Sequence, residues 1–136
     1  MKYLLDVNAL VALGFLQHEF HERVAAWVRI RASKEVLELA TCSITELGFV
    51  RALAQASQYG FTIAHARALL LRLKIGHSVK FTFIADDHDV SHLPAWVKTA
   101  KQTTDGHLMQ LAKAKGAILA TLNRSIPGAL LIPVQR

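Results

Sequence analysis

Apolar residues along the first third of the chain alternate between strand-like and helix-like spacing. Residues 2–5 (Lys-Tyr-Leu-Leu) form a short apolar run, which predicts a buried strand that ends at Asp6. From about Glu19 to Arg31, most apolar side chains recur on one face, and this spacing predicts an amphipathic helix. Residues 37–41 then alternate in polarity like a short strand. The pattern therefore predicts a strand, a helix and a second strand.

Capping signals mark the next two helices. Ser43 and Glu46 have the S-x-x-E spacing of a capping box, which predicts that a helix starts there. Residues 59–60 (Tyr-Gly) end that helix, and Thr62 is placed to cap another helix that runs to Gly76. We expect these two helices to form a hairpin.

Three more strands and one more helix complete the predicted chain. The predicted elements are a strand at 79–85, a loop from 86 to 94, a helix from Thr103 or Thr104 to about residue 115, and strands at 117–121 and 130–132. Strands that alternate with helices favour βαβ crossovers, a mostly parallel sheet and helices on both of its faces. No repeat or linker divides the chain, so we expect one α/β domain over residues 1–136.

Composition and charge restrict the function classes. The chain is 52% hydrophobic but has no apolar run of the ~18 residues that a membrane span needs, and its one cysteine, Cys42, has no partner for an internal disulfide. These features predict a soluble protein of the reducing cytoplasm. The net charge of +6 favours anionic partners such as nucleic acid. The basic residues are scattered, so a solvated positive surface explains the same charge.

Three acidic residues and one asparagine lie close to the ends of the predicted strands. Asp6 follows the first strand, Glu46 lies just after the second, Asp105 begins the helix before the fourth, and Asn123 lies just past the fourth. In an open parallel sheet, ligands bind beyond the carboxyl ends of the strands. We therefore expect these side chains to face one cleft.

Clustered carboxylates are costly unless a cation neutralises them, and a hard ion such as Mg²⁺ prefers oxygen ligands. The residues thus predict a magnesium site on Asp6, Glu46 and Asp105 that hydrolyses a phosphodiester. Each residue also has a structural explanation. Asp6 could cap a helix, Glu46 could close the capping box and Asp105 could complement a helix dipole. Thr104 could likewise be an N-cap or could orient a water molecule.

Four segments of the chain resemble, in order and spacing, the motif regions of PIN-domain toxins of the VapC type. They are Leu4-Leu5-Asp6-Val7-Asn8-Ala9-Leu10, Ser43-Ile44-Thr45-Glu46-Leu47, Thr103-Thr104-Asp105-Gly106-His107-Leu108 and Ala120-Thr121-Leu122-Asn123-Arg124. Each motif is short, but together they span almost the whole chain.

The resemblance implies a PIN fold of three α/β/α layers and an endoribonuclease, dependent on Mg²⁺ or Mn²⁺, that cleaves tRNA or ribosomal RNA. It maps the catalytic carboxylates onto Asp6, Glu46 and Asp105, with Asp6 and Asp105 as metal ligands. Asn8, Thr104 and Asn123 would then orient these groups or a water molecule. The resemblance also implies a homodimer held inactive by a VapB-like antitoxin.

The chain departs from that family at Asn123, where a fourth acid is common. The neutral amide removes one charge from the metal site and predicts weaker binding of a second ion. It also motivates an alternative, a PIN-like module that binds RNA or an antitoxin without cleaving. A phosphotransfer domain is a further alternative, but it would need a second acid beside Asp6, where the chain has Val7 and Asn8.

Overall fold

A parallel five-stranded sheet forms the centre of the molecule. The computed structural model describes residues 1–135, and the strands pair in the order β3-β2-β1-β4-β5 with every pairing parallel. The strands are β1 (Lys2–Leu5), β2 (Glu38–Cys42), β3 (Lys80–Ile84), β4 (Ile118–Thr121) and β5 (Leu130–Leu131). The predicted parallel sheet is confirmed, and each predicted strand agrees with the structure to within a residue or two.

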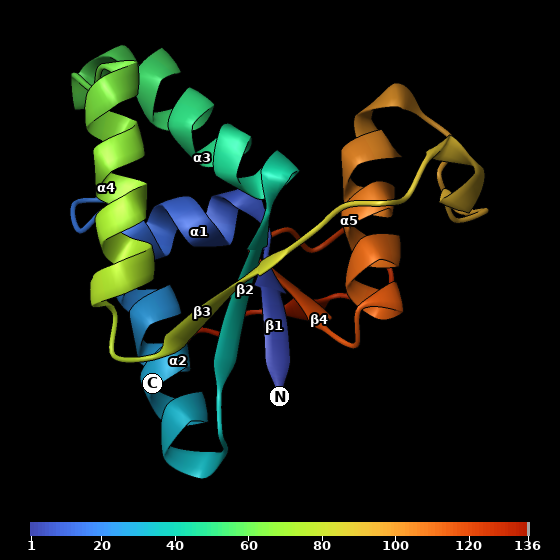
Figure 1. The fold of residues 1–136 in the computed structure, drawn as a ribbon, viewed down its shortest axis with the longest axis horizontal. Helices are drawn as coiled ribbons and strands as arrows, with labels where there is room; N and C mark the ends of the chain where they lie inside the picture. The colour runs from blue at the N-terminus through green and yellow to red at the C-terminus, as the bar shows by residue number, and fades with distance from the viewer. Residues whose placement is uncertain (136) are drawn as a thin grey trace.

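Helices cover both faces of this sheet. The helices are α1 (Val7–Gly14), α2 (His21–Lys34), α3 (Ser43–Gln55), α4 (Ile63–Gly76) and α5 (Thr103–Ala114), with short 3-10 turns at Ser57–Tyr59, Val90–His92 and Ala100–Gln102. Figure 1 shows α1 to α4 gathered on one side and α5 on the other, where the segment between β3 and α5 extends outward. Within residues 1–135, no helix combines the length and apolar character that a membrane span requires.

The hydrophobic core is split into two layers by the sheet. Successive residues of β1 point to opposite faces, so Tyr3 and Leu5 pack among α1 to α4, whereas Leu4 packs against Leu108 and Leu111 of α5. All five side chains are buried. The three-layer α/β/α arrangement expected from the sequence is therefore confirmed.

Helix α1 is the one helix of the structure that the spacing of apolar residues did not predict. Residues 9–13 are all buried, because α1 lies between the sheet, α2 and α3. So short an apolar run cannot be assigned to a helix or to a buried strand from its sequence alone. The Asp6 carboxylate caps it, since Oδ1 accepts a hydrogen bond from the Val7 N–H at 2.8 Å.

Gly48 sets the close approach between α3 and the start of α1. A Cβ at this position would overlap the Cγ2 methyl of Val7, the residue after Asp6. We expect Gly48→Ala to destabilise the protein by about 1–3 kcal/mol through overpacking. The measurement is urea unfolding, with Gly76→Ala as the matched control because a Cβ at Gly76 has no neighbour within 4 Å. Equal midpoints for the two variants would contradict this account of the contact.

Candidate active site

The carboxyl-terminal edge of the sheet opens into a pocket of about 530 Å³. Five of the six residues predicted for the site line it. They are Asp6, Asn8, Thr104, Asp105 and Asn123. They come from the end of β1, from α1, from α5 and from the turn after β4, which are brought together because β1 lies beside β4.

Asp6 is held in one orientation by both of its carboxylate oxygens. Oδ1 accepts the Val7 N–H, and Oδ2 accepts the Thr121 hydroxyl at 2.7 Å. The Asp6 backbone N–H also donates to the Ala120 carbonyl at 2.9 Å. The carboxylate is 6% exposed and has no basic partner within residues 1–135. It is therefore a fixed negative charge that no side chain neutralises.

Thr121 connects the polar groups of the site, and the sequence did not reveal this role. Besides donating to Asp6, its buried Oγ1 accepts the Asn123 N–H at 3.0 Å and lies 3.5 Å from the Asn8 Nδ2. Asn8 in turn accepts the Leu122 N–H at 3.1 Å. The register of β1 and β4, which pairs Leu5 with Ala120, is the signal that places Thr121 opposite Asp6. Asn8 thus ties α1 to the end of β4.

Asp105 faces the same pocket from the first turn of α5. Burial raises the pKa of its carboxyl group, and the negative charge of Asp6 raises it further. The Asn123 Nδ2 is 3.5 Å from Oδ2 of Asp105, and no basic side chain within the described part of the chain pairs with this carboxylate. Two carboxylates that repel each other in one pocket favour a bound cation.

The raised pKa of Asp105 predicts a pH-dependent stability for the metal-free protein. The folded chain holds this proton more tightly than the unfolded chain, so stability falls as the pH rises from about 4 through the folded pKa. In EDTA at pH 7 we expect Asp105→Asn to raise the Tm by about 1–3 °C. The gain should vanish near pH 4.

Asp89→Asn is the matched control for this measurement. Hydrogen bonds from Ser91 lower the pKa of Asp89, so loss of its charge removes a favourable contribution at pH 7. The Tm of this variant is expected to stay level or fall. A rise in Tm that is the same for both variants, or independent of pH, would show that repulsion in the pocket is not its cause.

Asn123 is oriented by its own turn. Its Oδ1 accepts the Ser125 N–H at 3.0 Å and the Ser125 hydroxyl at 2.8 Å, and its amide nitrogen is directed toward Asp105. The amide oxygen is thus already occupied, which leaves the nitrogen to face the pocket. This arrangement favours a hydrogen-bonding role over metal ligation.

The structure does not bring Glu46 into this pocket. Its Oε2 accepts the Lys74 ammonium at 2.5 Å and the Thr41 hydroxyl at 2.6 Å, and the side chain lines a separate groove between α3, α4 and β3. Accordingly, no cluster of three or more His, Cys, Asp or Glu side chains suited to a metal ion occurs within residues 1–135.

Two predicted caps are wrong. The box at the start of α3 involves Cys42, whose N–H is accepted by the Thr45 hydroxyl at 2.9 Å, instead of Ser43 and Glu46. The helix begins one residue earlier than the S-x-x-E spacing requires, and Glu46 is left free for Lys74. Thr104 is not an N-cap either, because α5 already begins at Thr103, and its exposed side chain lines the pocket.

Curated ribonucleases of Mycobacterium tuberculosis are similar to this chain over most of its length. Ribonuclease VapC38 is 38% identical over 90% of this chain and 86% of its own. Ribonuclease VapC44 is 34% identical over 95% of this chain and 94% of its own. Ribonuclease VapC29 is 30% identical, with 98% of each chain covered. No family model matches the sequence.

A solved structure shares the fold. The crystal structure of VapC20 of Mycobacterium tuberculosis, a toxin that cleaves the sarcin–ricin loop, matches with a TM-score of 0.57. The match covers 88% of this chain and 87% of that chain at 14% sequence identity. At this identity the match concerns the fold alone.

Proposed function

Because the chain belongs to the VapC family of ribonucleases, we propose that it is the toxin of a type II toxin–antitoxin pair and hydrolyses RNA phosphodiester bonds with Mg²⁺. The observation that carries this proposal is the pocket in which Asp6 and Asp105 lie together without a basic partner. Two such carboxylates repel a phosphate group, and a bound cation would offset that repulsion.

The donor set of the pocket fits a hard divalent ion. Both carboxylates supply oxygen atoms, which Mg²⁺ and Mn²⁺ prefer, and no soft ligand lines the pocket. Asp6 and Asp105 are the residues that we propose as ligands. When bound there, the ion would act as a Lewis acid that offsets charge on the reacting phosphate. With Asn123 in place of a further acid, we propose a single ion.

The other residues of the pocket hold the proposed ligands in position. Thr121 and the Val7 N–H fix the carboxylate of Asp6, and Asn8 fixes the end of β4 beside it. We propose that Asn123 orients Asp105 and that the exposed Thr104 hydroxyl positions a water molecule. Glu46 remains proposed as the third catalytic carboxylate on the basis of the family motif, and it must release Lys74 to take that part.

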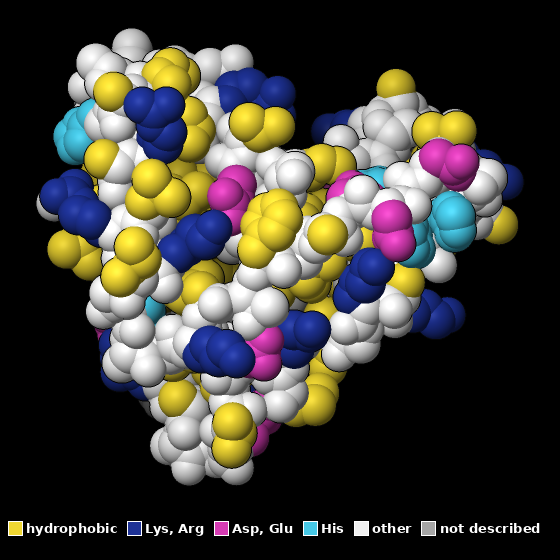
Figure 2. All heavy atoms as spheres, viewed as in Figure 1, with side chains coloured by type: hydrophobic (Ala, Val, Ile, Leu, Met, Phe, Trp, Pro, Cys, Tyr) yellow, Lys and Arg dark blue, Asp and Glu magenta, His cyan; other side chains and the backbone are white. Residues whose placement is uncertain are grey.

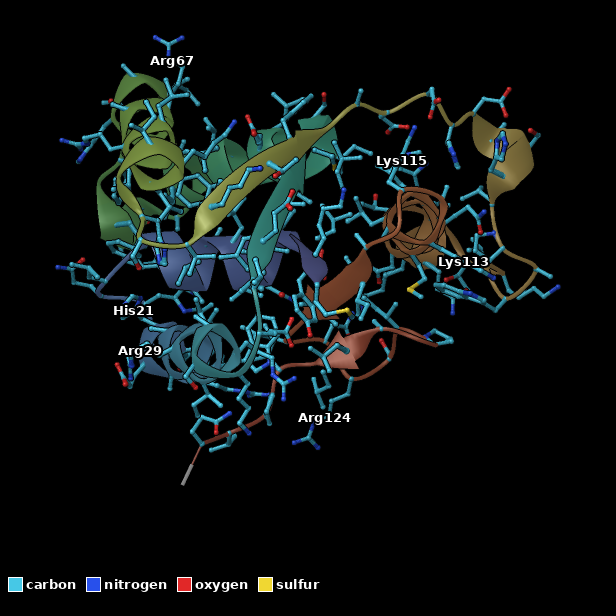
Figure 3. All side chains as sticks on the ribbon, turned by 60° about the horizontal axis from the view of Figure 1, so that its bottom comes forward. His21, Arg29, Arg67, Lys113, Lys115 and Arg124 are labelled. Atoms are coloured by element: carbon cyan, nitrogen blue, oxygen red, sulfur yellow. The ribbon has the colours of Figure 1, made fainter. Side chains whose placement is uncertain are left out.

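A positive surface supports RNA as the substrate. The net charge is +6, and Figure 3 shows labelled basic side chains on α2, near α5 and after β4. Lysines and arginines that neutralise phosphates release counterions and strengthen binding to nucleic acid. We propose a structured RNA such as tRNA or ribosomal RNA, in a cytoplasmic setting.

Exposed apolar side chains on α3, α4 and β3 support the proposed partners, a VapB-like antitoxin and a second copy of the chain. Leu47 is 68% exposed, Phe83 is 50% exposed and Leu71 is 49% exposed, and they line one groove. Figure 2 shows hydrophobic side chains gathered over this side of the molecule, with basic groups among them. Contiguous exposed apolar surface is typical of a protein contact.

The proposed activity is tested on a pool of tRNA and ribosomal RNA incubated with antitoxin-free protein. We expect discrete fragments with Mg²⁺ or Mn²⁺, none with EDTA, and recovery when Mg²⁺ is returned in excess. An intact pool with folded protein would favour the alternative, a PIN-like module that binds RNA or an antitoxin without cleaving. The ion pair of Glu46 and the neutral Asn123 are the observations that motivate this alternative.

A further inference from the structure

The pocket that holds Asp6 and Asp105 has a second wall, which the proposed hydrolysis does not use. His18, Arg51, Gln55 and Tyr59 line it. They come from the loop after α1, from α3 and from the 3-10 turn after α3. With about 530 Å³, the pocket lies in the range of roughly 300–1,000 Å³ that is usual for sites of small ligands. It therefore has room beyond a single phosphate group.

Arg51 and Gln55 give this wall its free polar groups. Gly48, Arg51, Ala52 and Gln55 all line the pocket, and their spacing along α3 places them on one face of the helix. Both polar side chains are exposed, and neither makes a side-chain hydrogen bond or ion pair with another residue in the described range 1–135. A guanidinium in this position is available to a phosphate oxygen.

Tyr59 supplies an aromatic surface on the same wall. The ring is half-buried and contacts Phe15 edge to face, with ring centroids 4.7 Å apart and an interplanar angle of 66°. Phe15 in turn contacts Phe61 at 5.4 Å. The Tyr59 N–H also donates to the Ala56 carbonyl at 3.0 Å. The ring is thus supported from behind while it lines the pocket.

His18 is oriented by a hydrogen bond from the backbone. Its Nδ1 accepts the Phe20 N–H at 3.1 Å, so the proton of the neutral ring lies on Nε2. Burial lowers the pKa of this imidazole, which favours the neutral form at neutral pH. The backbone N–H of His18 donates to the Phe15 carbonyl at 3.0 Å. An Nε2–H group of this kind pairs with the acceptor atoms on the edge of a base.

We propose that this wall is a subsite for one unpaired nucleotide of RNA, next to the phosphate that is cleaved. In it, Tyr59 stacks on the base, Arg51 binds the adjoining phosphate, and His18 and Gln55 hydrogen-bond to the edge of the base. A base must leave the helical stack to lie on Tyr59, so the subsite selects single-stranded nucleotides over duplex. This inference rests on the proposed ribonuclease function and concerns the specificity of the same site.

Binding of a short RNA in EDTA tests the subsite without cleavage. The probe is a fluorescein-labelled hexaribonucleotide of mixed sequence, free or annealed to its complement, and the readout is fluorescence anisotropy. We expect the single strand to bind more tightly than the duplex. Tyr59→Leu should weaken single-strand binding by about tenfold, whereas Tyr59→Phe should stay within about twofold. Arg51→Met should weaken it by a similar factor and reduce the salt slope by about 0.7.

Arg67→Met is the charge-matched control. Arg67 lies on α4, and Figure 3 shows it directed away from the body of the protein. Equal losses in Arg51→Met and Arg67→Met would overturn the subsite, as would equal binding of single strand and duplex or no measurable binding by wild type. Arg51 is exposed, so its variant tests the subsite even if Tyr59→Leu fails to fold.

Cleavage with Mg²⁺ is measured separately on the same proteins. Normal binding without cleavage would overturn the proposed nuclease and keep the subsite. Cleavage that is unaffected in all these variants would overturn the subsite and keep the nuclease.

Discussion

Replacing Asp6 with Asn is expected to lower the rate of RNA cleavage by about a hundredfold or more. The amide has the size of the carboxylate, and its oxygen can still accept one of the hydrogen bonds that Val7 and Thr121 donate. The variant therefore removes mainly the negative charge that would hold the metal ion. The measurement is the initial rate of fragment formation at saturating Mg²⁺, with the Tm in EDTA as a check of folding.

Asp89→Asn is the control for this rate, because Asp89 is an exposed acid in the loop after β3 and its removal changes the net charge equally. Its rate should stay within about twofold of wild type, since surface substitutions of this kind have small effects. Comparable losses in both variants would mean that overall charge, and not the pocket, determines the rate. An Asp6→Asn protein that cleaves normally would remove the basis for the proposed metal site.

The second large effect is expected at Glu46. Its proposed catalytic role requires the carboxylate to leave Lys74, and the Mg²⁺ dependence of cleavage measures this change. In the structure Lys74 neutralises this carboxylate, and the proposed catalytic role requires that contact to open. We expect Glu46→Gln to reduce cleavage by about tenfold or more and to raise the Mg²⁺ concentration that gives half of the maximal rate. Lys74→Met should lower that Mg²⁺ concentration, because it leaves a carboxylate without a counter-charge.

Measurements of the stability of these two variants distinguish a catalytic role of Glu46 from a purely structural one. Both groups of the ion pair are about three-quarters buried, with 23% of each side chain exposed, so either substitution should destabilise the metal-free protein by about 1 kcal/mol or more. Added Mg²⁺ should then restore the stability of Lys74→Met but not that of Glu46→Gln. If both variants keep the Mg²⁺ dependence of wild type and lose only stability, Glu46 merely ties α3 to α4.

The sequence predicted the strands well because each one is a short apolar run bounded by turn residues. It missed α1, whose apolar run is too short to be told from a buried strand, and it placed the cap of α3 on Ser43 instead of Cys42. A thiol is an unusual cap, and the S-x-x-E spacing next to it is the more familiar pattern. Local sequence patterns therefore predict the presence of a helix or strand more reliably than they predict its first residue.

The sequence predicted those residues of the candidate site whose positions follow from the order of the strands. Asp6, Asp105 and Asn123 meet because neighbouring parallel strands end at one edge of the sheet. The orientation of Glu46 depends on Lys74, which lies 28 residues farther along the chain on another helix, and no local pattern reveals that pairing. The wall with Arg51 and Tyr59 was missed for a similar reason, since its residues match no motif.

The hydrogen bond between Thr121 and Asp6 joins residues 115 positions apart in the sequence. Contacts of such separation form only after the intervening chain is available and are typical of slow steps in folding. During synthesis, β1, α1 and α3 emerge long before β4 and Thr121. A growing chain therefore carries the first carboxylate without the strand that orients it and without Asp105. The pocket is therefore assembled only when almost the entire domain has been translated.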